Sequence, residues 1–273
     1  MGTLFRITLH AEDTPRAREA MAAAFARAHQ LDAIFSDYRP ESELNRLCRA
    51  GSARVSPDLF AILERSSEVS RKSHGDFDVT VGVLVQLWRE SRKSGRLPSE
   101  AERREAMKKT GWKKIHLNRS TRTVRLAADG MRLDLGGIAK GYAADEMMRI
   151  LRGWGFPSAL IAASGDLLIG KPPPDAAGWS VSVGNDVQVL SNIAVSTSGD
   201  SEQFFLIDGV RYSHIVDPRT GLPLNQFKLN QSMVTVLAPE GWQADAWATA
   251  LSVLGKRPKS LKNLSVSFHP KLE

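Results

Sequence analysis

The sequence predicts an α+β fold. Apolar residues recur at three- and four-residue intervals through about the first 112 residues, as in amphipathic helices. From about residue 113 onward, short β-type runs separated by turn residues take over. These runs follow one another with only two helices among them, which argues against a doubly wound parallel sheet. We therefore expect a single domain over residues 1–273, with a helix-rich front part (about 1–112) and a strand-rich part (about 113–273).

The front part is expected to begin with a strand and to continue with three helices. Phe5, Ile7 and Leu9 alternate with polar residues, which is the period of a half-buried strand. The first helix follows the cap and first-turn proline of Asp13-Thr14-Pro15. A second helix begins at Ser56-Pro57. A third opens with the capping box Ser99 to Glu102 and ends near Gly111.

The back part alternates short strands with turns. The expected strands are Lys114 to Leu117, Thr123 to Leu126, Met131 to Leu135, Ala159 to Ala162, Trp179 to Val183, Ile193 to Ser196, Phe204 to Ile207, Val210 to Ile215 and Met233 to Leu237. Two helices interrupt them, one from about Ala139 to Leu151 and one from about Ala244 to Leu254. Gly153 and Gly255 are expected to end them.

The composition is that of an ordinary globular protein. With 42% hydrophobic and 25% charged residues, 21 glycines and 13 prolines, the chain is neither disordered nor collagen-like. The single cysteine, Cys48, excludes an intramolecular disulfide. No stretch approaches the ~18 to 20 uninterrupted apolar residues of a membrane helix.

The net charge of +7 is compatible with an anionic partner of any size. The lysine clusters are Lys108, Lys109, Lys113, Lys114 and the tail segment 256–262. They lack interleaved aromatic residues and a nucleic-acid motif, so a solvated surface is the better interpretation and no nucleic-acid partner is expected.

The first motif with chemical potential is Asp134 to Gly141, DLGGIAKG. A strand is expected to end at Leu135, and two glycines then allow a tight turn into a helix whose first N–H groups could bind an anion. Lys140 adds a cation there, which opposes the helix dipole unless an anion compensates it. The alternative is a simple strand-to-helix turn softened by glycine.

Two neighbouring patterns are weaker. Gly165 to Lys171 resembles a P-loop, but Pro172 stands where the Mg²⁺-binding Ser or Thr belongs, so this match is rejected. The stretch Ala163 to Asp166 is a turn of small residues against which a ligand could pack.

Ser196 to Asp200 and Tyr212 to Gly221 could form a polar pocket floor. His214 in the second segment is either a structural strand histidine or a catalytic base. A serine hydrolase is not supported, because the nucleophile-elbow pattern G-x-S-x-G does not occur.

Asp245 and Thr249 are four residues apart and share a face near the start of the last helix. A carboxylate and a hydroxyl so placed are suitable Mg²⁺ ligands. The alternative is an acidic residue favoured by the helix dipole beside a packed threonine.

Together these segments resemble the ApbE family of FAD:protein FMN transferases. The resemblance runs from Met1 to Gly255. Its motifs are DLGGIAKGYAAD (134–145), STSGD (196–200), YSHIVDPRTGLP (212–223) and ADAWATA (244–250), supported by SDYRPESELNRL (36–47) and GDFDVTVG (75–82).

The resemblance implies a T-fold-like architecture with mixed or antiparallel sheets and packed helices. It also implies cleavage of the FAD pyrophosphate with Mg²⁺ and transfer of FMN to a Thr or Ser hydroxyl of a partner flavoprotein, releasing AMP. Such chemistry needs an electrophile at the pyrophosphate oxygens and a base for the incoming hydroxyl. Two alternatives stay open: an FAD pyrophosphatase giving FMN and AMP, and a non-catalytic flavin-binding protein.

The resemblance also implies site residues. Those expected to contact FAD are Met1, Tyr38, Asp76, Phe77, Asp78, Asp134, Lys140 and Ile215. The expected Mg²⁺ ligands are Gly137 and Ala248 through their carbonyls and Asp245 and Thr249 through their side chains. The expected catalytic residues are His214 and Asp245.

The family is usually exported, often as a lipoprotein. The resemblance therefore implies a periplasmic or exported protein, with membrane association possible through a leader that has been removed.

Overall fold

The computed structural model describes residues 3–184, 186–199, 204–224, 233–258, 261 and 264–269. Its main sheet has six antiparallel strands in the order β1-β5-β6-β9-β12-β13. The bounds of these strands are β1 Phe5–Leu9, β5 Ala159–Ala163, β6 Asp166–Ile169, β9 Ile193–Gly199, β12 Met233–Ala238 and β13 Ser265–His269. Strands from both ends of the chain therefore meet in one sheet.

The described residues form three smaller antiparallel sheets besides the main one. A three-stranded sheet has the order β2-β4-β3, and two hairpins are β7-β8 and β10-β11. Their bounds are β2 Ser52–Arg54, β3 Ile115–Asn118, β4 Thr123–Leu126, β7 Trp179–Val183, β8 Asp186–Leu190, β10 Phe204–Ile207 and β11 Val210–Ser213.

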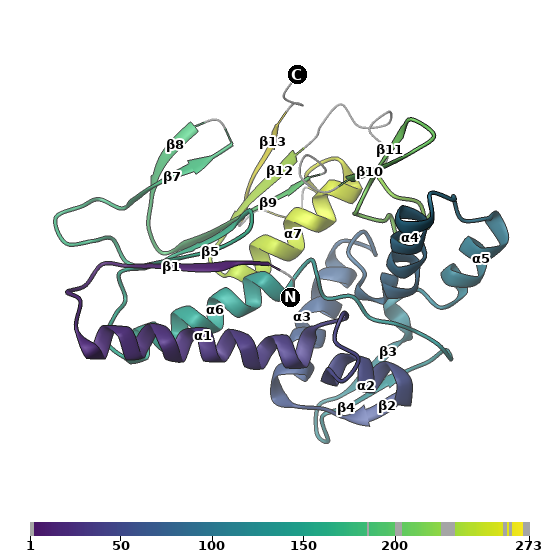
Figure 1. Ribbon diagram of the computed structural model, residues 1–273, viewed down its shortest axis with the longest axis horizontal. Coiled ribbons are helices and arrows are strands. Elements are labelled where there is room, and N and C mark those ends of the chain that lie inside the picture. The colour runs from purple at the N-terminus through teal and green to yellow at the C-terminus, as the bar shows by residue number, and fades with distance from the viewer. Residues whose placement is uncertain are drawn as a thin grey trace.

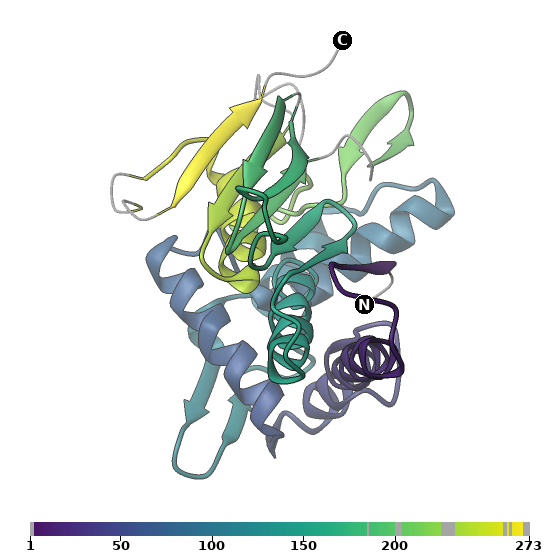
Figure 2. The same cartoon turned by 90° about the vertical axis from the view of Figure 1, so that its left-hand side faces the viewer.

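Four of the described helices, α1, α3, α6 and α7, form layers on one side of the main sheet. The bounds of all the described helices are α1 Pro15–Phe35, α2 Glu43–Ala50, α3 Pro57–Lys72, α4 Gly82–Ser94, α5 Glu100–Lys108, α6 Ala139–Gly153 and α7 Gly241–Leu254, with short 3-10 turns at Val79–Val81 and Trp112–Lys114. Helices α6 and α7 pack side by side against the sheet, and α1 and α3 pack on these two helices (Figures 1 and 2). The predicted α+β fold is thus confirmed.

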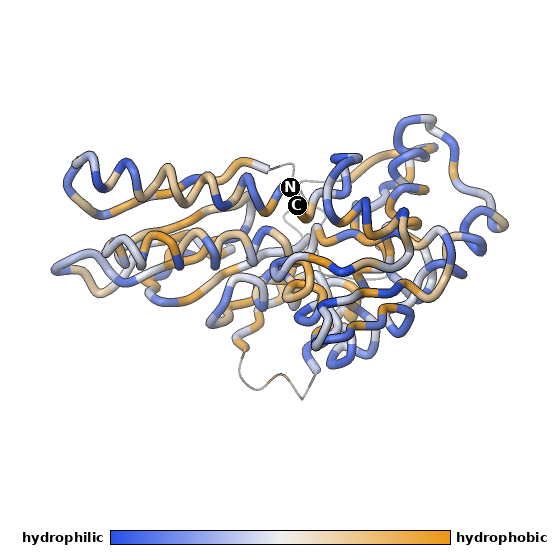
Figure 3. The backbone as a smooth tube through the Cα atoms, turned by 90° about the horizontal axis from the view of Figure 1, so that it is seen from below, coloured by the Kyte–Doolittle hydropathy of each residue, from blue (hydrophilic) through white to orange (hydrophobic). Residues whose placement is uncertain are grey.

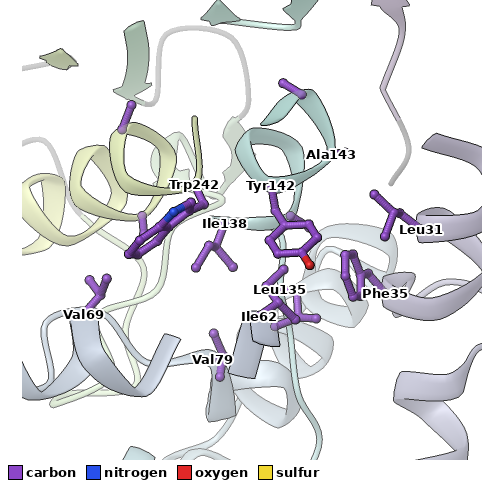
Figure 4. Close-up of a cluster of buried hydrophobic side chains, with 14 of the residues drawn as sticks. Leu31, Phe35, Ile62, Val69, Val79, Leu135, Ile138, Tyr142, Ala143 and Trp242 are labelled. Carbon is purple, nitrogen blue, oxygen red and sulfur yellow. The ribbon is translucent and has the colours of Figure 1, made fainter. Parts of the chain in front are cut away.

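The largest hydrophobic cluster joins both parts of the chain. Figure 4 shows Phe35 of α1, Ile62 of α3, Ile138 and Tyr142 at the start of α6, and Trp242 of α7 converging between the helices. The rings of Phe35 and Tyr142 meet edge to face with centroids 5.4 Å apart. Burying side chains of this size contributes about 1.5–3 kcal/mol each. The start of α6 is consequently anchored in the core.

Hydrophilic segments lie mainly at the periphery of the chain trace and hydrophobic ones inside it (Figure 3). In the part of the chain that the structure describes, no helix has the length and apolar character needed to cross a membrane.

The side-chain caps foreseen from the sequence are present. Thr14, Ser56 and Ser99 each accept a hydrogen bond from a backbone N–H in the first turn of α1, α3 and α5, and the capping box between Ser99 and Glu102 is complete. Gly255 ends α7 with φ 72°, in the left-handed region that glycine adopts without strain.

Several expectations about elements were wrong or incomplete. The segment Met131 to Leu135 is not a strand, although its side chains alternate between buried and less buried positions. It runs extended across the core, and Asp134 N donates to Val79 O (2.8 Å). The elements that the sequence reading did not predict are α2, α4, β2, β6, β8 and β13.

Candidate functional site

A cleft of about 480 Å³ lies where the first turns of α6 and α7 meet the main sheet. Its walls come from the segments after α1 and α3, from α4, from the ends of β5 and β9, and from the loop after β11. All of the predicted site residues except Met1 and Ala248 line this cleft. Met1 lies outside the described residues, as does Asp200 of the STSGD motif.

The predicted turn at the start of α6 forms one wall. Gly136 N donates to the Asp134 carboxylate (2.7 Å), which holds the turn. Helix α6 then begins behind Ile138, whose side chain does not cap it. Its first N–H groups bind within the protein instead, because Ala139 N donates to Leu135 O (2.9 Å) and Gly141 N donates to the Asp245 carboxylate (3.1 Å). A Cβ on Gly137 would lie 2.8 Å from Thr249 Oγ1, so the close approach of this turn to α7 requires glycine there.

Lys140 lies between two carboxylates at the base of the cleft. Its Nζ is 2.9 Å from Asp245 Oδ1, 3.3 Å from Asp166 Oδ2 and 2.9 Å from the carbonyl oxygen of Gly136. The other oxygen of Asp245 accepts a hydrogen bond from Gly141 N (3.1 Å), and the other oxygen of Asp166 accepts one from Ser196 Oγ. Asp245 and Asp166 are 2% and 7% exposed.

The protonation equilibria of this cluster reflect two carboxylates sharing one ammonium. Burial raises the pKa of Asp245, and the nearby Asp166 raises it further, against the opposing effect of Lys140. Burial alone would lower the pKa of Lys140, but Asp166 and Asp245 outweigh it and raise that pKa above its usual value. The lysine is therefore cationic at neutral pH.

The structure brings three of the four predicted metal ligands together. Asp245 and Thr249 lie one turn apart on α7, and Thr249 faces Gly137. Thr249 Oγ1 is also 3.4 Å from Ser198 Oγ of β9. Ala248 is fully buried, and its carbonyl accepts a hydrogen bond from Ser252 Oγ (2.9 Å).

Among the described residues, no group of three or more His, Cys, Asp or Glu side chains is arranged to hold a metal ion. The donors at this point are instead the two carboxylates of Asp166 and Asp245, hydroxyls and backbone carbonyls. Hard oxygen donors of these kinds are the ones Mg²⁺ takes.

His214 follows the last residue of β11 and lies exposed on the cleft wall. Its neighbour Ile215 is buried and donates its backbone N–H to Ser213 Oγ (3.1 Å). The loop that follows is held at Asp217, whose carbonyl accepts the backbone N–H of Gly221 (2.8 Å). An exposed imidazole on a fixed loop can receive a proton from a group that enters the cleft.

The loop after β11 is fastened to the segment after α3. Arg219 pairs with Asp217 and, through Nη1, with Asp76 (both 2.9 Å). Burial raises the pKa of Asp76, and Arg219 opposes this. Two predicted FAD contacts, Asp76 and Phe77, thus line the same cleft as His214.

Asp78 also lines the cleft, and its hydrogen bonds serve the local fold. Its carboxylate accepts hydrogen bonds from the backbone N–H (2.8 Å) and hydroxyl (2.6 Å) of Thr80 and from the backbone N–H of Trp112 (2.8 Å). Burial raises its pKa, and the bonds from Thr80 and Trp112 work against this rise. These hydrogen bonds thus connect the turn after α3 to the segment after α5.

Tyr38 also lines the cleft, and the guanidinium of Arg89 lies over its ring, 4.3 Å from the ring centroid. Arg89 also binds the Asp37 carboxylate and lies 3.3 Å from Asp134 Oδ2. Burial raises the pKa of Asp134, and Asp37 adds to this while Arg89 opposes it. The Tyr38 side chain is 66% exposed, so its free face can stack on a planar ligand.

Some cleft residues were not predicted as site residues. Asp166 and Arg89 form ion pairs with predicted site residues, Lys140 and Asp134. The only sequence signal for Asp166 was its place in the small-residue turn after Gly165. A stack of Trp88, Phe205 and Tyr212, with centroids 5.5–6.4 Å apart, supports the cleft beside His214.

Comparisons with known proteins identify the family of this chain. A family model described as "ApbE family" matches residues 1–267. The FAD:protein FMN transferase of Treponema pallidum is 33% identical over 93% of this chain and 77% of its own length.

Two solved structures have the same architecture. The ApbE protein of Thermotoga maritima superposes with a TM-score of 0.86 and 30% identity, covering 98% of this chain and 91% of the other. The apo flavinyl transferase ApbE of Pseudomonas stutzeri gives 0.84 and 28%, covering 100% of this chain and 89% of the other. These findings confirm the resemblance drawn from the motifs, and the chain therefore belongs to the ApbE family.

Proposed function

We propose that this protein is an FAD:protein FMN transferase that moves FMN from FAD to a Thr or Ser hydroxyl of a partner flavoprotein and releases AMP. Relatives of this chain carry the name FAD:protein FMN transferase. The observation that carries the proposal is the meeting, in one cleft, of Lys140, the Asp245–Thr249 pair and an exposed His214. These supply a cation for the pyrophosphate, hard oxygen donors and a base.

The residues at the base of the cleft fit Mg²⁺. Two buried carboxylates face a single ammonium, which leaves a negative charge that a divalent cation can balance. Asp166 Oδ2 is buried and accepts no well-directed hydrogen bond from any described residue. Asp245, Thr249 and the carbonyl of Gly137 would hold the ion, with the carbonyl of Ala248 as a further proposed ligand. When bound, Mg²⁺ supplies charge neutralisation at the pyrophosphate oxygens.

The protein's own groups would position FAD. The ammonium of Lys140, in the first turn of α6, would pair with the pyrophosphate. The flavin and adenosine ends would contact Tyr38, Asp134 and Ile215, together with Met1, Asp76, Phe77 and Asp78.

His214 would accept the proton of the incoming Thr or Ser hydroxyl. The hydroxyl oxygen would form a bond to the phosphorus of the FMN half, and the bond from that phosphorus to the bridging oxygen would break. AMP would then leave with the bridging oxygen. Positioning and charge dominate the cost of such a transfer, which suits a site with one base and few other reactive side chains.

The test is incubation with FAD, Mg²⁺ and a flavoprotein carrying the acceptor residue, read by in-gel flavin fluorescence and mass spectrometry. Covalent FMN on the acceptor supports transfer. Absence of covalent flavin across several acceptors, with the protein folded and FAD bound, would contradict it.

The exposure of His214 favours hydrolysis as a second candidate, because water can reach the same base. An FAD pyrophosphatase would produce FMN and AMP without any acceptor. A flavin-binding protein without catalysis would bind FAD and give neither product, and His214→Ala would leave that binding nearly intact.

On the resemblance alone, we also propose a periplasmic or exported location, with possible membrane anchoring by a lipoprotein leader. Fractionation of cells that express the full gene tests this proposal.

A further inference from the structure

At the base of the cleft, oxygen atoms of the protein form a cation-binding site, here called the cation seat. The ammonium group of Lys140 occupies it. The ammonium of Lys140 contacts oxygens from three separate elements: Asp245 on α7, Asp166 at the start of β6 and the carbonyl of Gly136. The side chains of Asp245 and Asp166 are 3% and 9% exposed, and that of Lys140 is 23% exposed. A single monovalent cation thus faces two buried carboxylates.

Each carboxylate is oriented by the oxygen that does not face the lysine. Asp245 Oδ2 accepts the backbone N–H of Gly141, and Asp166 Oδ1 accepts the hydroxyl of Ser196. The remaining oxygens, Asp245 Oδ1 and Asp166 Oδ2, both turn toward Nζ of Lys140. These two oxygens are therefore held in place by groups other than the cation between them.

The ammonium of Lys140 does not satisfy all the oxygens of the seat. Asp166 Oδ2 is buried and receives no well-directed hydrogen bond from the described residues, although it lies 3.3 Å from Nζ. Two carboxylates and one ammonium leave an excess negative charge where burial makes charge costly. Such a seat favours a divalent cation over a monovalent one.

We propose that Lys140 is the internal counter-ion of this seat, that a divalent metal ion competes with it for Asp245 and Asp166, and that Asp166 thereby belongs to the metal site. Only the choice of Mg²⁺ as the ion rests on the proposed function. The metal displaces the ammonium from both carboxylates, and the displaced ammonium then pairs with an anion in the cleft. Metal and anion binding consequently favour each other.

The competition predicts changes of opposite sign for two substitutions. Lys140→Met removes the competing cation, so Mg²⁺ alone should bind about tenfold more tightly or better. Asp166→Asn removes one anionic oxygen donor, so Mg²⁺ alone should bind about tenfold more weakly. If Lys140 and Asp166 served only to stabilise the fold, both substitutions would weaken Mg²⁺ binding.

The experiment is a calorimetric titration of the purified full chain with MgCl₂, without flavin or acceptor. Lys72→Met and Asp13→Asn are matched charge controls, because both residues lie in surface ion pairs on or beside other helices. Both controls should bind Mg²⁺ as the unmodified protein does. Equal or weaker Mg²⁺ binding by Lys140→Met, or unchanged binding by Asp166→Asn, would overturn the proposal.

Lys140→Met leaves two buried carboxylates without their cation, so its folding needs a separate check by circular dichroism. If it is unfolded without metal, the comparison moves to the double variant Lys140→Met/Asp166→Asn, which carries one carboxylate less. The double variant should bind Mg²⁺ more tightly than Asp166→Asn alone. Equal or weaker binding would contradict the competition.

The outcome is separable from that of the proposed function. Opposite shifts in Mg²⁺ affinity without any FMN transfer would support the seat and contradict the transferase. If the unmodified protein transfers FMN but Lys140→Met binds Mg²⁺ with unchanged affinity, the transferase is supported and the competition at the seat is contradicted.

Discussion

Asp145 of α6 and Asp245 of α7 each accept a hydrogen bond from a glycine near the start of the other's helix. Gly241 N donates to Asp145 Oδ1 (2.7 Å), and Gly141 N donates to Asp245 Oδ2 (3.1 Å). The two glycines touch through their backbones, because a Cβ on Gly141 would lie 2.1 Å from the carbonyl oxygen of Gly241. The crossing of the two helices is thereby fixed where Lys140 meets Asp245.

The two helix starts share one short pattern. Residues 141–145 read GYAAD and residues 241–245 read GWQAD, so glycine, an aromatic residue, alanine and aspartate recur in the same places. Arg65 of α3 lies 5.0 Å from the ring centroids of both Tyr142 and Trp242. One cation thus supports both aromatic residues beneath the crossing.

Gly141→Ala is expected to destabilise the protein strongly. The added Cβ would overlap the backbone of Gly241, which cannot move as a flexible side chain can, so unfolding should require about 3 kcal/mol less. Chemical denaturation measures this. Gly153→Ala at the other end of α6 is the matched control, since a Cβ there meets nothing within 4 Å and should leave stability equal or higher. Equal stability of both variants would contradict the close crossing.

Asp145 is expected to make stability depend on pH. Burial raises its pKa to about 6 from 3.8, against the hydrogen bonds from Trp242 and Gly241, while Glu240 raises and Arg65 lowers it. The folded protein therefore keeps a proton that the unfolded chain releases, and this group adds stability as pH falls from about 6 toward 3.8.

Asp145→Asn removes this contribution. Urea unfolding at several pH values measures this. Below pH 6, the free energy of unfolding of the unmodified protein should rise relative to that of the variant by up to about 1.4 kcal/mol per pH unit. A difference that stays constant between pH 7 and pH 4 would show that Asp145 does not titrate in this way.

Gly137→Ala is expected to weaken Mg²⁺ binding while keeping the fold. The new methyl group would lie 2.8 Å from Thr249 Oγ1 and 3.1 Å from its Cγ2, so Thr249 must turn away from its place in the cleft. Calorimetry with MgCl₂ should show roughly a tenfold loss of affinity. Gly153→Ala again serves as control, and an unchanged affinity in Gly137→Ala would exclude Thr249 from the metal site.

His214→Ala is expected to separate binding from catalysis. FAD binding should change little, because His214 lies on the exposed wall, whereas FMN transfer should fall by about 10²-fold or more. His29→Ala, which removes an exposed imidazole from α1, should transfer FMN at the usual rate. Transfer by His214→Ala at the rate of the control would remove the histidine from the proton step.

Local signals in the sequence predicted much of the fold. Thr14, Ser56 and Ser99 predicted three helix starts, because a capping side chain and the N–H group it binds lie within four residues of each other in the sequence. Helix α7 begins at Gly241, three residues before the predicted Ala244, because its first N–H groups bind Asp145 from a distant helix. No local pattern contains that contact.

The motifs also predicted residues that the fold does bring together. Asp134, Lys140, His214, Asp245 and Thr249 line one cleft although they are spread over more than a hundred residues. Their roles there remain predictions. Asp166 and Arg89 escaped notice because each gains its importance from an ion partner on another element.

The measurement that tests the transferase most directly follows both halves of FAD at once. FAD, Mg²⁺ and an acceptor flavoprotein are incubated with the protein, and covalent FMN on the acceptor is counted by mass spectrometry against the AMP released. The account predicts one AMP for each FMN attached to a Thr or Ser, and formation of both products slowed by about 10²-fold or more with His214→Ala. AMP and free FMN without covalent flavin would contradict transfer, as would bound FAD that is never cleaved.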